Sequence, residues 1–357
     1  MKSMVCLSHL PWQAAPTRAQ QLLTRMGDAE ILFFQPPHST PGRSGQRGRR
    51  MRPNLTVYTL PAQRPADGPA LLRRRGQVRL AAFVLEVMQR HRFREPLLWV
   101  TSPENLFLLD ALPHRGLVYD CSREWDELPL EWESELASRA DVCFAASPGL
   151  ARRLAPCCDN IAVIPNGVND LLFRQEPTLP AELRRRPGPV LCRVGAVTAD
   201  LDLEPLRQTA LRRPGWDFFL LGHADRAAEE ALARCPNVHF LGRVPAAEVP
   251  DFLLSCHVCF DLVSHRTRGS DILPAHVYEY LASGRPAVLM LDEDQVVPFP
   301  DVVYSAHTPG QFLTCCEHAL AEDPSWVSQR RRSCAHAARW SVRAAEASRI
   351  LDAAGLL

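Results

Sequence analysis

Two acidic residues, Asp271 and Glu279, flank the start of a helix that the sequence marks at both ends. Pro274 suits the first helical position, where its missing N–H costs nothing, and Gly284 followed by Pro286 ends the helix. Asp271 then lies in the preceding loop and Glu279 in the second turn. This spacing could set one carboxylate beside a sugar and the other beside the ribose of a nucleotide that crosses the helix start.

The first backbone amides of this helix could bind phosphate. The amides from Ala275 to Val277 have no acceptor within the helix and lie at the positive end of its dipole, so they suit a phosphate or diphosphate. Together with Leu273 and Pro274 they form the predicted nucleotide-binding segment. The alternative is an ordinary amphipathic helix with its apolar residues in a core, which does not explain the glycine–serine loop at 269–270.

Short apolar runs alternate with amphipathic stretches along most of the chain, which is the pattern of parallel βαβ units. The runs predict strands at residues 4–7, 31–34, 55–59, 97–100, 117–119, 142–145 and 161–164, and again at 190–194, 217–221, 238–241 and 258–262. Residues 169–189, rich in proline and arginine, mark the crossing between these two series. We predict an α/β fold of two Rossmann-like domains with parallel sheets facing across a cleft, where ligands bind beyond the carboxyl ends of the strands.

The sequence also predicts the structure of two further segments. Residues 38–54 are rich in arginine, glycine, proline and serine without periodicity, which predicts a mobile loop. Residues 326–357 are predicted to be helical. The apolar face of that helical stretch comprises Ala337, Trp340, Ala344, Ala347 and Ile350.

The helix described above resembles the E-x7-E region of the retaining GT-B glycosyltransferases of family four, in the form LP-x-x-x-YEYLA-x-G-x-P. Residues 142–150 with 164–168, and then 236–245, are similar to other parts of that family in the same order. The stretches 8–12, 17–21 and 119–125 resemble a bacterial subgroup that builds cell-surface polysaccharides, such as the teichuronic-acid transferases.

The resemblance implies a GT-B fold. Residues 1–168 and a returning helix at 340–357 would form the N-terminal, acceptor-side domain, and residues 169–339 the C-terminal domain that holds a nucleotide-sugar of the UDP or GDP type. It implies transfer of the sugar, with retention, to a glycan or lipid-linked acceptor in bacterial surface polysaccharide synthesis.

The resemblance also assigns roles to three acidic residues. Glu279 matches the acid that holds the nucleotide ribose, and Asp271 falls on the catalytic acid near the donor sugar. Asp120 ends a strand of the first domain, where family members contact the transferred sugar, and is the second catalytic candidate.

Phosphate binding departs from the family pattern. Gly195 follows the first strand of the donor domain, but the arginine and lysine that the family carries after this strand are missing. We therefore assign the neutralisation of the phosphates to Arg266 or Arg268.

Two residues near the first strand allow two interpretations each. His9 ends that strand and either lines an acceptor pocket or makes a structural hydrogen bond. Trp12 either stacks on a sugar ring or belongs to the core.

We expect no metal and no resident cofactor, so the charge of the leaving diphosphate must be met by the helix start and basic side chains. Asp200 and Asp202 are formally a pair that could bind a divalent ion, but we interpret them as carboxylates capping a helix. Cys256 and Cys259 have a metal-like spacing without a second pair, and they fall in a predicted strand.

The composition limits the partners. A net charge of +1 gives no strong field toward nucleic acid. No apolar run is long enough to span a bilayer, no signal-peptide pattern is present, and the twelve cysteines lie mostly in apolar segments as buried thiols do. We expect a cytoplasmic protein.

Arginines cluster at 43–52, 73–75, 184–186 and 330–332. These clusters are either solvated faces or a surface for peripheral contact with the inner face of the membrane.

Two other function classes compete with this interpretation. A dehydrogenase needs a G-x-G-x-x-G turn after the first strand of a domain, and neither the turn after Ser8 nor the one at Gly195 supplies it. A non-catalytic sugar- or nucleotide-binding protein on the same scaffold stays open, because Asp271 stands where the family often has glutamate and the Arg–Lys pair is missing.

Overall fold

The computed structural model describes residues 2–13, 16–27, 29–37, 47–62, 70–173, 176–264, 270–291, 295, 299 and 301–357. The chain forms two compact units, which we call unit 1 (Met1–Pro165 with Arg343–Leu357) and unit 2 (Asn166–Val342). The limits predicted from the sequence are residues 168 and 340.

Unit 1 is built on an eight-stranded sheet in the order β3-β4-β2-β1-β5-β6-β7-β8. Neighbouring strands run parallel, except for β3 and β4, which pair antiparallel. The strands are β1 (Lys2–Leu7), β2 (Ala29–Gln35), β3 (Arg49–Arg52), β4 (Leu55–Thr59), β5 (Leu97–Val100), β6 (Gly116–Cys121), β7 (Val142–Ala145) and β8 (Ile161–Val163).

Strand β3 corrects the prediction of a loop over 38–54. Residues 38–46 lie outside the described residues, but Arg49–Arg52 pairs with β4, with Arg49 opposite Val57. All four side chains of β3 are exposed. A short edge strand of arginines gains backbone hydrogen bonds on one side while its charges stay in water, so it carries no hydrophobic periodicity for a sequence argument to find.

The helices of unit 1 begin at recognisable caps. Thr17 and Gln20 form a capping box at α1, and Ser147 accepts a hydrogen bond from the Leu150 amide at α4. The helical segments are α1 (Arg18–Leu23), α2 (Ala70–Arg90), η1 (Pro103–Leu108), α3 (Leu130–Arg139) and α4 (Pro148–Leu154).

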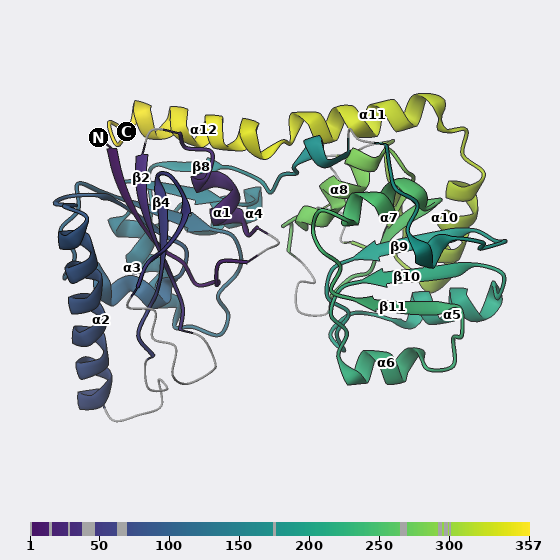
Figure 1. Cartoon of the computed structure of the whole chain (residues 1–357), viewed down its shortest axis with the longest axis horizontal. Coiled ribbons are helices and arrows are strands. Elements are labelled where there is room, and N and C mark those ends of the chain that lie inside the picture. Colours follow the sequence, from purple (N-terminus) through teal and green to yellow (C-terminus); the bar gives the residue numbers. More distant parts are fainter. Residues whose placement is uncertain are drawn as a thin grey trace. The chain divides into compact units, whose positions relative to one another are not determined.

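The last residues of the chain also belong to unit 1, where both chain ends lie together (Figure 1). Lys2 Nζ is 3.8 Å from Asp352 Oδ1, and Arg115 Nη2 donates to the carbonyl of Leu356 at 2.8 Å. The helix α12 (Trp340–Ala353) buries Trp340, Ala344, Ala347 and Leu351. Ala337, which the predicted apolar face included, is exposed.

Unit 2 has a six-stranded parallel sheet in the order β11-β10-β9-β12-β13-β14. Its strands are β9 (Val190–Val194), β10 (Asp217–Leu221), β11 (Val238–Gly242), β12 (Val258–Asp261), β13 (Ala287–Leu289) and β14 (Tyr304–Ser305). The helical segments are η2 (Asp170–Phe173), η3 (Ala181–Leu183), α5 (Glu204–Arg212), α6 (Arg226–Leu232), α7 (Val249–Ser255), α8 (Ala275–Ser283), α10 (Pro309–Leu320) and α11 (Pro324–Ala337).

Helices cover both faces of this sheet, as Figure 1 shows for α7 and α8 against α5 and α6. Alternate residues of one strand enter different cores: Cys192 packs with α7, α8 and α11, whereas Leu191 packs with α5, α6 and α10. Burial on both faces explains why these strands appear in the sequence as continuous apolar runs.

Each sheet has a point where the strand order reverses. In unit 2, β9 has β10 on one side and β12 on the other, and in unit 1, β1 lies between β2 and β5. The loops after such strands diverge to opposite faces, which leaves room for a ligand at the carboxyl edge.

Among the described residues, no helix is both long and apolar enough to cross a membrane. All twelve cysteines are free thiols.

The arginine cluster at 330–332 is not wholly a solvated face. Arg331 is 1% exposed and donates to both carboxylate oxygens of Glu322 at 2.6 Å and to the carbonyl of Val302 at 2.6 Å.

Candidate functional site

The predicted helix at the centre of the site is α8, and its ends largely follow the sequence signals. Gly284 closes it in the left-handed conformation at φ 75°. Pro274 precedes the first helical residue, with φ −59° and ψ 141°, instead of occupying the first turn. The amide of Val277 donates to the Pro274 carbonyl at 3.1 Å, so it is not available to a phosphate as predicted. The amides of Ala275 and His276 are the ones left at the helix start.

The loop that leads into α8 is fixed from two sides. Asn166 Nδ2 donates to the carbonyl of Leu273 at 3.0 Å, and Gln295 Nε2 donates to the carbonyl of Ile272 at 2.7 Å. Ser270, which is buried, accepts a hydrogen bond from the Ile272 amide. The approach to the helix is therefore set in advance, which lowers the entropy lost when a ligand binds there.

A buried charged triad lies where β9 and β12 end, at the switch point of the unit 2 sheet. Asp261 accepts hydrogen bonds from Arg193 Nε at 2.8 Å and from His276 Nε2 at 2.5 Å. The side chains of Arg193 and Asp261 are 5% and 2% exposed, and that of His276 is 20% exposed. Burial alone would raise the pKa of Asp261, but His276 and Arg193 overcome this and hold that pKa below its usual value.

Arg193 also donates hydrogen bonds to the backbone. Its Nη1 donates to the carbonyls of Gly195 at 3.2 Å and Ala196 at 2.9 Å. Through these bonds the guanidinium shapes the loop after β9. The side chains of Arg193, Asp261 and His276 were not predicted as part of the site; only the backbone amide of His276 was. The available signal was a charged residue at the end of a buried strand, which describes Asp261.

Glycines allow the β9 loop to approach its neighbours. Gly195 has φ 118°, and a Cβ there would lie 3.6 Å from the ring of His276. At Gly222 a Cβ would come within 2.1 Å of the Gly195 carbonyl oxygen. The predicted residue Gly195 is thus brought against the first turn of α8, next to the predicted residue Ala275.

The predicted acids of unit 2 occupy different surroundings. Glu279 is half-buried, and among the described residues none donates a hydrogen bond to it. Burial raises the pKa of the Glu279 carboxyl, and nearby His276 opposes this rise. Asp271 is half-buried in the loop before α8. The Leu273 side chain lies in the core. Arg266 and Arg268 lie outside the described residues.

Asp120, the third predicted acid, is in unit 1, inside β6. Its Oδ1 accepts a hydrogen bond from Arg18 Nε at 2.8 Å, and the side chains are 1% and 8% exposed. The sequence did not point to Arg18 as a site residue. Its partner lies 102 positions away, which only the fold brings close.

His9 lies at the switch point of the unit 1 sheet. Its Nδ1 is 2.7 Å from Thr101 Oγ1, and its ring meets Trp125 edge to face, with 5.1 Å between ring centroids. Burial, together with the charge of Arg123, lowers the pKa of His9 to about 4. The ring is therefore neutral near pH 7. Trp12 packs edge to face on Phe33, with 5.1 Å between ring centroids.

The two residue pairs whose spacing could suit a metal ion make other contacts in the described part of the chain. Asp202 accepts a hydrogen bond from the Glu204 amide at 3.2 Å, and Asp200 bonds the hydroxyls of Thr198 and Ser264. Cys256 and Cys259 are buried, with their sulfurs 3.7 Å apart. Within the described ranges, no three histidine, cysteine, aspartate or glutamate side chains are grouped so that they could hold a metal ion.

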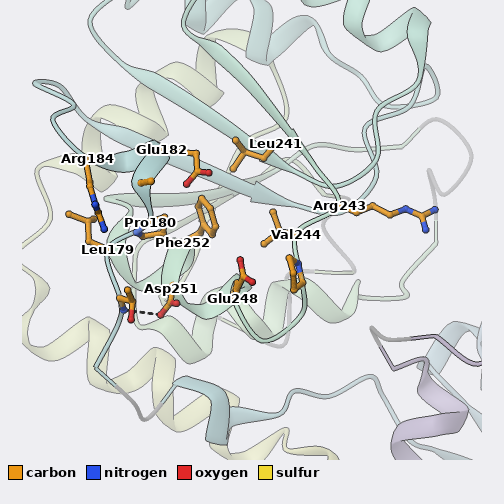
Figure 2. A pocket seen from close by; sticks show the side chains of 13 residues that line it. Leu179, Pro180, Glu182, Arg184, Leu241, Arg243, Val244, Glu248, Asp251 and Phe252 are labelled. Carbon is orange, nitrogen blue, oxygen red and sulfur yellow. Dashed lines mark hydrogen bonds between the residues drawn. The ribbon is translucent and has the colours of Figure 1, made fainter.

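A separate hollow of about 510 Å³ lies in unit 2, beside α7. Figure 2 shows the carboxylates of Glu182, Glu248 and Asp251 around it, with Phe252 at its wall. Asp251 is already used, because it accepts a hydrogen bond from the Thr178 amide at 3.0 Å. The hollow shares no residue with the triad.

No protein-family model matches the chain. The protein called a teichuronic acid biosynthesis glycosyltransferase, TuaH, of Bacillus subtilis is 25% identical over 274 residues, which cover 68% of each chain. Among solved structures, sucrose-phosphate synthase from Thermosynechococcus elongatus matches with a TM-score of 0.76 at 14% identity, over 99% of both chains.

Two further structures were solved with ligands. Anabaena HepE, in complex with UDP and glucose, matches with a TM-score of 0.73 at 17% identity over 99% of both chains. The trehalose-6-phosphate protein of E. coli, bound with UDP-2-fluoro glucose, matches with a TM-score of 0.73 at 10% identity, over 98% of this chain and 99% of the other. The α/β fold of two parallel-sheet, Rossmann-like units is that of the GT-B glycosyltransferases.

Proposed function

We propose that the chain is a glycosyltransferase that moves a sugar from a nucleotide-sugar donor, of the UDP or GDP type, to a glycan or lipid-linked acceptor. The observation that carries this proposal is the Arg193–Asp261–His276 triad, which fixes the Gly195 loop and the start of α8 at the switch point of the unit 2 sheet. In open parallel sheets this is the place where nucleotides bind. The likeness to TuaH supports the same activity.

The donor would lie across the start of α8. Its diphosphate would accept hydrogen bonds from the amides of Ala275 and His276, and Gly195 lets the backbone come close to it. The carboxylate of Glu279, to which no described residue donates, would accept hydrogen bonds from the ribose hydroxyls. Asp271, in the fixed loop before the helix, would face the donor sugar.

The leaving diphosphate gains negative charge as the sugar departs, and this charge must be met. His276 gives Nε2 to Asp261, which leaves Nδ1 to donate when the ring is protonated. With the helix start, His276 would do the work that we first assigned to Arg266 or Arg268. The reaction would then need no metal and no resident cofactor.

The transfer would proceed with retention, in the synthesis of a bacterial surface polysaccharide, as the resemblance implies. Unit 1 would bind the acceptor at the carboxyl edge of its sheet, where Asp120 lies in β6. A lipid-linked acceptor would be met at the inner face of the membrane. The exposed arginines of β3 offer a surface for anionic lipid heads there.

One observation favours a second candidate, a non-catalytic protein that binds a nucleotide or a nucleotide-sugar. Arg193 lies at the loop after β9, and all its observed hydrogen bonds go to Asp261 and the backbone. A site with fewer cations would bind the donor yet stabilise the leaving group less.

The test is a panel of UDP- and GDP-sugars, read both as thermal shift and as hydrolysis of the donor. Binding together with hydrolysis supports the transferase, and hydrolysis should survive EDTA. Binding without hydrolysis, or without transfer to any sugar acceptor offered, selects the second candidate. Absence of any thermal shift across the panel refutes both.

A further inference from the structure

Unit 1 contains a buried guanidinium that is only partly satisfied. Arg18 donates through Nε to Asp120 Oδ1 at 2.8 Å, and its side chain is 8% exposed. Both terminal nitrogens, Nη1 and Nη2, are closed off from solvent, and neither has a hydrogen-bond partner among the described residues. A buried polar group left without a partner destabilises the folded state, and a charged group does so more strongly.

Two other arginines of the chain use both terminal nitrogens. Arg153 places Nη1 and Nη2 on the carboxylate of Glu133, and Arg331 does the same with Glu322. In Arg18 the edge that carries Nη1 and Nη2, which matches a carboxylate or phosphate with two parallel hydrogen bonds, is unused. Asp120 neutralises the charge of Arg18 without occupying this edge.

The surroundings suit a sugar. Polar side chains gather at the carboxyl edge of the unit 1 sheet: His9 and Thr101 bond each other at 2.7 Å, and Gln35 donates to Thr59 at 2.8 Å. These groups are uncharged near pH 7, because the pKa of His9 is about 4. Hydroxyl, amide and imidazole groups can exchange hydrogen bonds with sugar hydroxyls, but they cannot neutralise an anion.

We propose that Arg18 is the residue of unit 1 that selects an acidic acceptor, by binding a carboxylate or phosphate carried on the acceptor sugar. This inference rests on the proposed sugar transfer and names the chemical class of its acceptor. The anion accepts hydrogen bonds from Nη1 and Nη2, while Asp120 holds the guanidinium through Nε. Both terminal nitrogens are closed off from solvent, so binding requires the Arg18 side chain to turn about its contact at Nε.

The test compares four probes on the full chain by calorimetry at low salt. The first three are glucuronate, glucose 6-phosphate and neutral glucose. We expect one or both acids to bind about 10- to 100-fold more tightly than glucose, the range of a charged hydrogen bond. Glucuronate and glucose 6-phosphate differ in their anion, so the tighter of the two identifies which group the site takes. Inorganic phosphate is the fourth probe. If it binds as tightly as the better acid sugar, the site takes a free anion only and the proposal falls.

Two variants separate recognition from folding. Arg18→Gln can keep one hydrogen bond to Asp120 but removes the charge, so the preference for acid sugars should disappear while glucose affinity is unchanged. Arg153→Gln removes an arginine of unit 1 that is already paired, and should keep the preference. If Arg18→Gln does not fold, the pair Arg18→Met with Asp120→Asn removes both charges together and should fold while losing the preference.

Equal affinity for all probes in the unaltered protein, or a preference that survives the loss of Arg18, overturns the proposal. The nucleotide-sugar panel is measured on the same preparation. Acid-sugar binding through Arg18 without donor binding would refute the proposed transferase and leave this site standing. Donor binding and hydrolysis without a preference for acid sugars would support the proposed transferase and refute the role of Arg18.

Discussion

His276 Nε2 lies 2.5 Å from Asp261 Oδ2, while Asp261 Oδ1 accepts a hydrogen bond from Arg193 at 2.8 Å. One buried carboxylate therefore joins the last residues of β9 and β12 to the first turn of α8. The position of the proposed phosphate site depends on this carboxylate, although Asp261 itself would touch no ligand.

Replacing Asp261 with asparagine should destabilise unit 2 by about 3–5 kcal/mol, because Arg193 would be left without its buried counter-charge. Urea unfolding, followed by hydrogen exchange of the β9 and β12 amides, measures this loss. Asp217→Asn is the matched control. Asp217 also joins an arginine and a histidine, Arg186 at 3.2 Å and His239 at 2.6 Å, but its side chain is 15% exposed. Its loss should cost about 1 kcal/mol or less, and equal losses would contradict the role given to burial.

Replacing Glu279 with glutamine should weaken the binding of UDP or GDP by about 1.5–3 kcal/mol, the worth of a charged hydrogen bond to the ribose. Calorimetry with both nucleotides measures the change. Glu248→Gln, on the wall of the hollow in Figure 2, is the control and should bind as the unaltered protein does. Unchanged affinity in Glu279→Gln would remove Glu279 from the site.

Replacing Gly222 with alanine should displace the Gly195 carbonyl, since the new Cβ would stand 2.1 Å from that oxygen. Overpacking of this kind typically costs about 1–3 kcal/mol. We expect a lower melting temperature and weaker nucleotide binding together. Gly215→Ala, where a Cβ meets nothing within 4 Å, should change neither. A Gly222→Ala protein that melts and binds normally would show that the β9 loop is not constrained in this way.

The stability of unit 1 should depend on pH through His9. Its pKa falls from an ordinary 6.5 to about 4, because burial and Arg123 outweigh the opposing charges of Asp120 and Glu127. Between these values the unfolded chain binds a proton that the folded chain does not. Stability is therefore lost as the pH falls from 6.5 toward 4, by up to about 1.4 kcal/mol per pH unit.

The variant His9→Asn lacks this proton. The unfolding free energies of the variant and the unaltered protein are measured between pH 7 and pH 4.5. If His9→Asn is the less stable protein at pH 7, the two values should converge as the pH falls. If the two proteins are almost equally stable at pH 7, the values should cross. A constant difference over this range would show that His9 titrates normally in the folded protein.

The sequence predicted α8 well because its signals are local: a proline at the start, and a glycine and proline at the end, act through neighbouring backbone only. Most strands were found for a similar reason, since burial on both faces leaves continuous apolar runs. Pro274 lies one residue before the helix instead of in its first turn. Its carbonyl accepts the first hydrogen bond of the helix, from the Val277 amide.

The triad could not be predicted in the same way. Arg193 and Asp261 are 68 positions apart, and a charged residue in a strand gives no sign of its partner until the strand order is known. The burial of Arg331 follows from the same cause, because only the fold brings the Val302 carbonyl to its Nε at 2.6 Å. Strand β3 was missed because its arginines face water.

The tie between the two ends of the chain sets an order for folding during synthesis. Unit 2 is continuous in sequence, so all its residues are synthesised before residues 343–357. Unit 1 begins first, yet it lacks the strip that holds Lys2 and Arg115 until translation has passed through the whole of unit 2. The usual progression, in which the first domain matures before the second, is therefore reversed for its final step. A released chain that ends at residue 342 should contain a folded unit 2 and an incomplete, protease-sensitive unit 1.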